Sequence, residues 1–325
     1  MKKFIWFAIV LLAVPFQTAS QDVTRVERAD AAFRDWAQAA GVKHAAIAVG
    51  YEGAVVYTAG IGQRADEPAD IASLSKAITA MCLADVLAEN GLTFKTRLSD
   101  VFDNVANAQS ADLTLGQLVS QASGLDEDET QDHMWRWVNE AKDRHQDAAE
   151  LALARGPNMA QLGQFNYNNE NYAVLGWLIS ALTGAPYIEA CKARIFGEGS
   201  IGASDRWGAF AAWGGWKVSA EDYLSFVHRY FGSGSAMAQN PEGLPNVYLG
   251  QSRYYGMGSF WRQSHGGGYN FWHFGLLCFS GDGNSAGAYF ASYGGKWSVS
   301  VNFSGCITGD QQRALDTLLW RAFNE

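Results

Sequence analysis

The chain has 325 residues, of which 48% are hydrophobic and 18% are charged, and it carries a formal net charge of −9. A chain of this length and composition can bury one large core or two modest ones, which excludes a disordered or fibrous protein. An acidic chain without a basic stripe is also a poor partner for nucleic acid and for anionic lipid surfaces.

Residues 1–20 have the three-part pattern of a secretory signal peptide. Lys2 and Lys3 precede an apolar run over residues 4–16, and the small residues 18–20 offer a cleavage point before Gln21. The run is short for a membrane span and no later segment is long enough, although an N-terminal membrane tether is the alternative. We therefore expect an exported protein, periplasmic or secreted, without a stable membrane span.

Strand patterns occur near both ends of the remaining chain, and helical patterns fill the middle. Predicted strands lie at residues 44–51, 54–59, 254–261, 269–279, 287–293 and 297–304. Predicted helices lie at residues 26–40, 72–89, 113–121, 126–154, 169–183, 187–196, 220–231 and 310–323. Residues 232–250 are the expected loop. This order predicts an α/β (α+β) fold, with a sheet domain over residues 21–90 and 233–325 and a helical domain over residues 91–232.

Ser73 and Lys76 form an S-x-x-K motif at the start of the helix predicted for residues 72–89. A spacing of three places the hydroxyl and the amine on one helical face, a turn apart. A serine hydroxyl is a weak nucleophile unless a base accepts its proton, and a lysine can do so when burial lowers its pKa. Because so short a motif also occurs by chance, it needs support from elsewhere in the chain.

Two further segments supply that support. Residues 165–169 read Phe-Asn-Tyr-Asn-Asn, which places Y-x-N, from Tyr167 to Asn169, at the start of a predicted helix. Residues 272–275 read Trp-His-Phe-Gly within an aromatic strand near the C-terminus. With these motifs the sequence resembles the penicillin-recognising serine hydrolases, and within them the group of class C β-lactamases, family VIII esterases and D-alanyl-D-alanine peptidases. Further segments match the pattern of this group in the same order, at residues 71–80, 90–92, 113–125 and 214–222.

The resemblance implies a β-lactamase/transpeptidase-like fold, with an antiparallel sheet flanked by helices and a mostly helical domain. It also implies that Ser73 is the nucleophile and Lys76 its proton acceptor or electrostatic partner. Tyr167 would pass the proton to the leaving group, with a pKa lowered by positive neighbours.

The remaining motif residues would bind the substrate or support the catalytic groups. Asn169 would hold Lys76 or the substrate amide, and His273, close to Tyr167, would replace the lysine that many relatives carry. The oxyanion hole would consist of the backbone N–H groups of Ser73 and of Leu276, which follows Gly275 in the third motif. The resemblance implies neither a metal nor an organic cofactor.

The sequence departs from the family pattern at two positions, and the first departure bears on the substrate. Phe274 stands where relatives that hydrolyse β-lactams usually have Thr or Ser, and a phenyl ring cannot supply the hydroxyl that helps bind the β-lactam carboxylate. Gln121 stands where the family often has His. The sequence therefore predicts an esterase or a D-amino-acid peptidase or amidase acting on a small molecule or peptide. A class C-like β-lactamase and a non-catalytic penicillin-binding-type scaffold are the alternatives, and the oligomeric state stays open.

Other reactive residue patterns have less support. Residues 283–287 satisfy G-x-S-x-G around Ser285, but a strand is expected to follow and no histidine occurs after His273, so an α/β-hydrolase triad is not expected. The six histidines show no metal-binding spacing. Of the four cysteines, Cys278 and Cys306 are the pair most worth testing for a disulfide, and four buried free thiols are the alternative.

Overall fold

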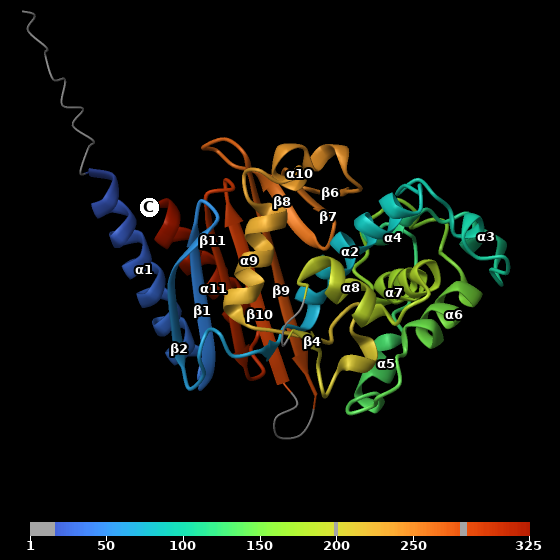
Figure 1. Cartoon of the computed structure of the whole chain (residues 1–325), viewed down its shortest axis with the longest axis horizontal. Coiled ribbons are helices and arrows are strands. Elements are labelled where there is room, and N and C mark those ends of the chain that lie inside the picture. Colours follow the sequence, from blue (N-terminus) through green and yellow to red (C-terminus); the bar gives the residue numbers. More distant parts are fainter. Residues whose placement is uncertain (1–16, 198–200, 280–284) are drawn as a thin grey trace, which may run out of the picture.

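The computed structural model describes residues 17–197, 201–279 and 285–325, so most of the predicted signal peptide, residues 1–16, lies outside the described residues. The described chain forms an eight-stranded antiparallel sheet with a large helical region beside it (Figure 1). The strand order is β2-β1-β11-β10-β9-β8-β7-β6. The strands span His44–Tyr51 (β1), Ala54–Ile61 (β2), Val247–Gly250 (β6), Arg253–Gly256 (β7), Ser259–Gln263 (β8), Tyr269–Cys278 (β9), Ser285–Tyr293 (β10) and Trp297–Ser304 (β11).

The sheet joins the two ends of the chain. β1 pairs antiparallel with β11, so that His44 lies opposite Ser304. Ile47 of β1 belongs to the core beneath helices α1 (Gln17–Ala40) and α11 (Gly309–Asn324), whereas its neighbour Ala48 packs toward α9 (Ala220–Phe231). The period-two alternation of a strand thus gives the sheet two covered faces (Figure 1). This arrangement confirms the predicted antiparallel sheet flanked by helices.

The helical region follows β2 in the chain and is connected to the sheet by short strands. Its helices span Ser75–Glu89 (α2), Ala108–Ala111 (α3), Leu115–Val119 (α4), Thr130–His133 (α5), His145–Arg155 (α6), Asn169–Thr183 (α7) and Tyr187–Ile195 (α8). A three-stranded sheet of order β3-β5-β4 joins Ala69–Asp70 (β3), Trp216–Val218 (β5) and Gly202–Ala203 (β4). The division into domains at residues 90/91 and 232/233 stays a prediction.

Within the described ranges, no single helix has both the length and the apolar character needed to cross a membrane. The consecutive helices α7 and α8 meet both criteria only when taken together, with a bend of 83° between them.

Three predicted elements differ from the structure. The helix predicted for residues 126–154 is wrong in its middle: α5 is followed by a 3₁₀ turn at Met134–Arg136, and α6 begins only at His145. Asn139 has a φ of 64°, and the Asp143 carboxylate accepts a hydrogen bond from the His145 backbone, so local polar contacts replace a continuous helix. The strand predicted for residues 254–261 is two strands, β7 and β8. The loop predicted for residues 232–250 contains helix α10 (Ala236–Gln239) and strand β6.

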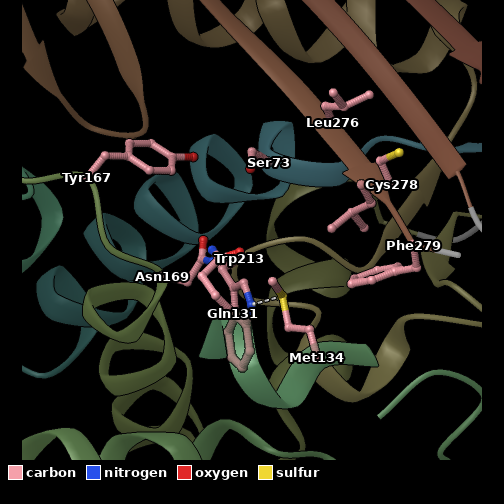
Figure 2. A pocket seen from close by; sticks show the side chains of 10 residues that line it. Ser73, Gln131, Met134, Tyr167, Asn169, Trp213, Leu276, Cys278 and Phe279 are labelled. Carbon is pink, nitrogen blue, oxygen red and sulfur yellow. Dashed lines mark hydrogen bonds between the residues drawn. The ribbon is translucent and has the colours of Figure 1, made fainter. Parts of the chain in front are cut away.

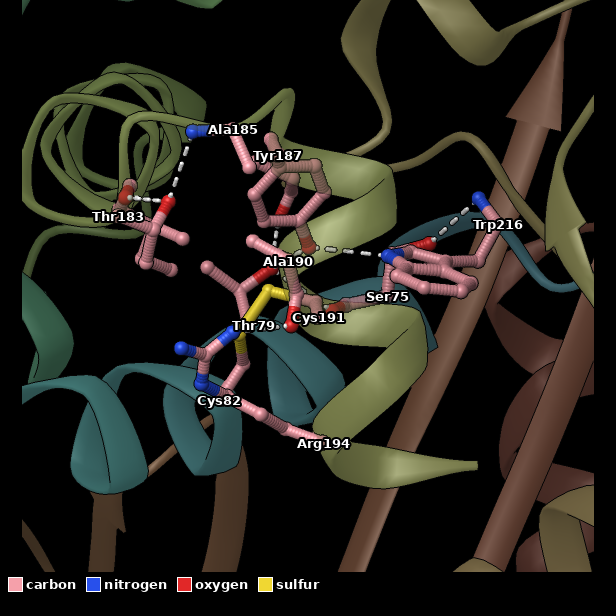
Figure 3. The surroundings of a disulfide bond; sticks show 12 residues. Ser75, Thr79, Cys82, Thr183, Ala185, Tyr187, Ala190, Cys191, Arg194 and Trp216 are labelled. Atoms are coloured by element: carbon pink, nitrogen blue, oxygen red, sulfur yellow. Dashed lines mark hydrogen bonds between the residues drawn. A yellow bond between two sulfur atoms is a disulfide. The ribbon is translucent and has the colours of Figure 1, made fainter. Parts of the chain in front are cut away.

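Two disulfides are present. Cys278–Cys306 is the pair that the sequence singled out, and it joins the end of β9 to the segment after β11. Cys82–Cys191 was not expected, and it joins α2 to α8 in a fully buried position (Figure 3). Beside the second bridge, the Tyr187 hydroxyl contacts the hydroxyl of Thr79 on α2 at 2.6 Å. The helix that begins with the S-x-x-K motif is therefore held from behind by covalent and polar contacts.

Candidate active site

Ser73 lies in a tight turn immediately before α2. The turn is a 3₁₀ segment, Ala72–Leu74, in which Ala72 has a φ of 47°, an unfavourable value for a residue with a Cβ. Strand β9 approaches this turn closely at Gly275, where a Cβ would lie 2.4 Å from the Ile71 carbonyl oxygen and 2.9 Å from the Ser73 backbone nitrogen. Only a glycine permits this approach, which brings the backbone of the third motif against the predicted nucleophile.

Lys76 is fully buried in the first turn of α2 and contacts Ser73 directly. Its Nζ lies 3.2 Å from the Ser73 Oγ, 2.8 Å from the Asn169 Oδ1 and 2.9 Å from the Trp213 carbonyl oxygen. Burial lowers the pKa of Lys76 to about 7, although the negative charge of Asp128 acts in the opposite direction. An amine with this pKa is uncharged in a large fraction of molecules at neutral pH, so it can accept a proton from the serine hydroxyl.

Tyr167 lies beside this pair, just before α7. Figure 2 shows its hydroxyl pointing toward Ser73, and its ring centroid lies 4.8 Å from the Lys76 Nζ. The residue as a whole is 36% exposed, but its hydroxyl end is enclosed, and burial raises the pKa of Tyr167 well above the usual value despite a hydrogen bond with Ser73. The expectation that neighbours lower this pKa is therefore wrong, because burial dominates. At neutral pH the phenol keeps its proton and can donate it.

Gln121, which departs from the family pattern, holds the segment that carries Tyr167. Its backbone carbonyl accepts a hydrogen bond from the Asn166 backbone at 2.9 Å, and its side-chain Oε1 accepts one from the Asn168 backbone at 3.1 Å. The two bonds flank Tyr167 on both sides. The Asn168 side chain in turn caps α7 by accepting from the Glu170 backbone. Gln121 thereby fixes the backbone position of Tyr167.

His273 lies behind Tyr167 rather than in the cavity. Its ring centroid is 5.9 Å from that of Tyr167, 5.4 Å from that of Phe260 and 5.9 Å from that of Tyr255. The residue is 2% exposed, and burial, together with the nearby Lys76, lowers the pKa of His273 to about 3. At neutral pH this imidazole is uncharged, so it cannot replace the positive charge of the lysine that many relatives have here.

Sequence reasoning missed the polar residues behind Asn169. The Asp128 carboxylate accepts hydrogen bonds from the Asn169 backbone at 3.1 Å and from the Thr130 hydroxyl at 2.5 Å. Thr130 also accepts a bond from the Asn169 Nδ2 at 3.1 Å, which leaves the Asn169 Oδ1 turned toward Lys76. Asp128 is thus connected to Lys76 through Asn169. The sequence predicts one continuous helix over residues 126–154. In such a helix nothing indicates that the acidic run contacts α7, so this contact was missed.

The cavity at Ser73 has a volume of about 320 Å³. Its lining residues come from the helical region and from the end of β9 (Figure 2): Ser73, Gln131, Met134, Tyr167, Asn169, Trp213, Leu276, Leu277, Cys278 and Phe279. The Trp213 indole donates to the Met134 sulfur at 3.2 Å, which fixes two of the apolar side chains. The structure therefore brings Ser73, Lys76, Tyr167, Asn169, Gly275 and Leu276 together at one cavity, with His273 behind it.

The other residues singled out from the sequence lie elsewhere. Phe274 points to the opposite face of β9, where its ring packs 4.4 Å from that of Tyr289, so it blocks nothing in the cavity. Ser285 begins β10 opposite Cys278 and therefore lies in a strand instead of a strand-to-helix turn. Among the described residues, no group of three or more His, Cys, Asp or Glu side chains is arranged to hold a metal ion.

Comparison with known proteins gives one consistent result. The family model described as Beta-lactamase matches residues 29–299. The chain resembles a β-lactamase/D-alanine carboxypeptidase from Pseudomonas syringae, with a TM-score of 0.71, 14% identity and coverage of 93% of this chain and 99% of that one. It also resembles a D-stereospecific amidohydrolase from Streptomyces sp., with a TM-score of 0.64, 19% identity and coverage of 93% and 98%.

A third structural relative is an octameric penicillin-binding protein homologue from Pyrococcus abyssi, with a TM-score of 0.69, 17% identity and coverage of 91% of this chain and 77% of that one. A search of curated proteins gave no match. At these identities the solved structures establish a shared fold.

Proposed function

This chain belongs to the β-lactamase family, and on that premise we propose that it is a serine hydrolase that forms an acyl-enzyme on Ser73. The observation that carries the proposal is the 3.2 Å contact between the Ser73 Oγ and the Nζ of a lysine whose pKa is about 7. Family members are generally serine hydrolases, but the fold alone does not establish activity. The catalytic pair is the specific support in this chain.

The proposed reaction has two halves. In the first, Lys76 accepts the Ser73 proton while the Ser73 oxygen attacks the substrate carbonyl, and the backbone N–H groups of Ser73 and Leu276 stabilise the oxyanion. Tyr167, protonated at neutral pH, donates a proton to the leaving group as the bond to it breaks. In the second half, the Tyr167 phenolate takes a proton from the water that attacks the acyl-enzyme, and the protonated Lys76 returns its proton to the Ser73 oxygen as the acid is released.

Two substrate classes have support: carboxylic esters, and amides or peptides of D-amino acids. The second class agrees with the printed descriptions of two structural relatives, a D-stereospecific amidohydrolase and a β-lactamase/D-alanine carboxypeptidase. The first rests on the sequence, in which Phe274 offers no hydroxyl to bind a β-lactam carboxylate. We also propose that the protein is exported, as its N-terminal pattern predicts. Two disulfides support that proposal, because such bonds persist in oxidising compartments.

The test is hydrolysis of p-nitrophenyl butyrate and of D-amino-acid p-nitroanilides by the mature protein and by its Ser73→Ala variant. We expect turnover of at least one substrate by the parent protein and none by the variant, with the acyl group found on Ser73 by mass spectrometry. Equal turnover by both proteins would refute the proposal. Absence of both turnover and labelling by any acylating agent would favour a non-catalytic scaffold.

A further inference from the structure

Although the chain is acidic, the described residues that line the cavity at Ser73 carry no formal charge. Of the ten residues that line it, none is acidic or basic. Apolar side chains make up much of the surface, with Met134, Trp213 and Phe279 among them. The side-chain amides in this lining are those of Gln131 and Asn169, and both are engaged: the Gln131 Nε2 donates to the Asp128 Oδ2 at 3.0 Å, and the Asn169 Oδ1 accepts from Lys76.

The described basic side chains close to the cavity are engaged with other groups. Lys76 lies behind Ser73 with Nζ bonded to three oxygen atoms, and His273 is enclosed by aromatic rings. Arg155 pairs with Glu129 and Glu170 behind the loop that carries Asp128. Arg136, close to Met134 in sequence, lies with its guanidinium 5.0 Å from the exposed Trp135 ring.

The negative charge of Asp128 acts on two of the reacting groups. Asp128 raises the pKa of Lys76 and also contributes to the raised pKa of Tyr167. It follows Asp126 and Glu127, which are both exposed at the surface of the same loop. Among the described residues, a carboxylate brought into this cavity would meet only Lys76, which is partly protonated and already bonded to three oxygen atoms, and it would lose its water and be repelled by Asp128. Burial of an unpaired charge is among the most costly changes in a protein environment.

The two sides of Ser73 can be assigned to the two parts of a substrate. Tyr167 lies on one side and Cys278 and Phe279 on the other (Figure 2). In the proposed reaction Tyr167 donates to the leaving group, so the leaving group lies on its side and the acyl group extends toward Phe279. Aromatic rings stand behind the first position, and apolar side chains line the second.

From this distribution we infer that the substrate is uncharged on both sides of the scissile bond: a neutral ester or amide with an apolar acyl group and a leaving group that has no carboxylate. The inference rests on the proposed function and narrows its substrate class. It disfavours peptides that end in a free carboxylate next to the scissile bond, and equally β-lactams, which carry a carboxylate close to the reacting amide.

Matched substrates that differ only in one charge test the inference. On the leaving-group side, acetyl-D-leucyl-D-alaninamide is compared with acetyl-D-leucyl-D-alanine, and 3-carbamoylphenyl butyrate with 3-carboxyphenyl butyrate. On the acyl side, phenyl butyrate is compared with the phenyl monoester of succinic acid. In each pair that is turned over, we expect kcat/KM of the neutral substrate to be higher by about 100-fold or more, because the charged partner must be desolvated without a counter-ion. Equal or faster turnover of the carboxylates would overturn the inference.

A variant that adds a cation provides the second measurement. Gln131 is exposed at the cavity rim, and its Nε2 donates to the Asp128 Oδ2 at 3.0 Å. The ammonium of Gln131→Lys should therefore replace a donor to Asp128, offsetting the negative charge of Asp128 as well as offering a cation, and Gln131→Met is its uncharged control. Gln131→Lys should raise kcat/KM for the carboxylate substrates relative to their neutral partners by about fivefold, as expected for a partly exposed charge pair. Gln131→Met should leave that ratio unchanged. An unchanged ratio in Gln131→Lys would count against the electrostatic argument.

The Ser73→Ala protein separates failure of the inference from failure of the proposed function. If the variant still hydrolyses the neutral substrates, Ser73 is not the nucleophile. A preference for neutral over charged substrates would then give no support to an inference about this cavity. If the variant is inactive while the parent protein accepts carboxylates as readily as neutral substrates, the hydrolase assignment stands and the charge preference is wrong.

Discussion

The cavity at Ser73 has two walls of different construction. The helical wall, formed by Lys76, Tyr167, Asn169 and the Asp128 loop, contributes side chains joined by hydrogen bonds. The sheet wall, residues 275–279 at the end of β9 and just beyond it, contributes a backbone in close contact with the Ser73 turn and apolar side chains around the cavity. The helical wall therefore sets proton transfer, whereas the sheet wall sets the position and shape of what is bound. Substitutions on the helical wall should therefore impair proton transfer, and those on the sheet wall should impair positioning of the substrate.

The largest effect is expected on the helical wall, from Lys76→Met. Methionine fills nearly the same space but cannot accept a proton, so kcat should fall by about 10³-fold or more. The variant should remain folded, because removing a buried amine also removes a cost of burial. Lys43→Met, at an exposed lysine, is the matched control and should keep full activity. A Lys76→Met protein with near-parental kcat would assign the base elsewhere.

The same variant has a thermodynamic signature. Because the pKa of Lys76 falls from 10.5 in the unfolded chain to about 7 in the folded one, the unfolded state binds more protons between these values. The free energy of unfolding should therefore rise with pH across this window, through the contribution of Lys76. Urea titrations at several pH values should show that the free energy of unfolding rises less steeply with pH in Lys76→Met than in the parent protein.

On the sheet wall, the largest loss is expected from Gly275→Ala. The added Cβ would lie 2.4 Å from the Ile71 carbonyl oxygen, so β9 must move away from the Ser73 turn. Loss of one oxyanion donor typically lowers kcat by about 10²–10³-fold, and we expect a loss in that range. Gly266→Ala is the control, since no atom lies within 4 Å of a Cβ there. Comparable kinetics for the two variants would mean that the close contact at Gly275 is not needed for catalysis.

The pH dependence of activity should separate the effect of the Asp128 charge on the pKa of Lys76 from the effect of the Asp128 hydrogen bonds on the plateau rate. In the parent protein, kcat/KM should rise with pH to a plateau above about 7, because only the uncharged Lys76 can accept the serine proton. Asp128→Asn removes the charge that raises the pKa of Lys76, so the acid limb should move to lower pH. The plateau should fall by about tenfold at most, since an asparagine oxygen can still accept a hydrogen bond. If the acid limb of the pH profile stays in place or moves to higher pH in Asp128→Asn, the Asp128 charge does not raise the pKa of Lys76.

The smallest effect on turnover is expected from the disulfide at the end of the sheet wall. Cys278→Ser with Cys306→Ser should change kcat/KM by less than about fivefold, because the bridge borders the cavity without touching the reacting groups. A mild thiol should also open this pair before Cys82–Cys191, since its cysteines are exposed and the other pair is fully buried. Thiol alkylation followed by mass spectrometry would measure the order, and earlier loss of the buried pair would contradict it.

Much of the sheet wall could be predicted from the sequence, because its signal is local. Aromatic and β-branched residues predict the strands β9–β11 directly. Gly275 is found with them, because it belongs to the third motif. The motif residues of the helical wall were also found, since Ser73 and Lys76 share one helical face and the Y-x-N motif begins a helix. The resemblance to a family then indicated that these distant segments meet.

What could not be predicted depended on contacts between distant segments. Asp128 reads as one member of an acidic run until the chain turns back and places it against Asn169. The raised pKa of Tyr167 follows from enclosure of its hydroxyl by separate segments of the chain, and a count of nearby positive charges gives the opposite sign. The Cys82–Cys191 pairing likewise depends on how α2 packs against α8, which no spacing in the sequence reveals.

The pairing of β1 with β11 has a consequence for synthesis of the chain. The first hairpin appears early at the ribosome, but its open edge is covered only by one of the last segments to be made. Until then the strand lacks its partner, and contacts between such distant segments form slowly. A truncation that removes β11 and α11 should leave an aggregating product with an exposed β1 edge.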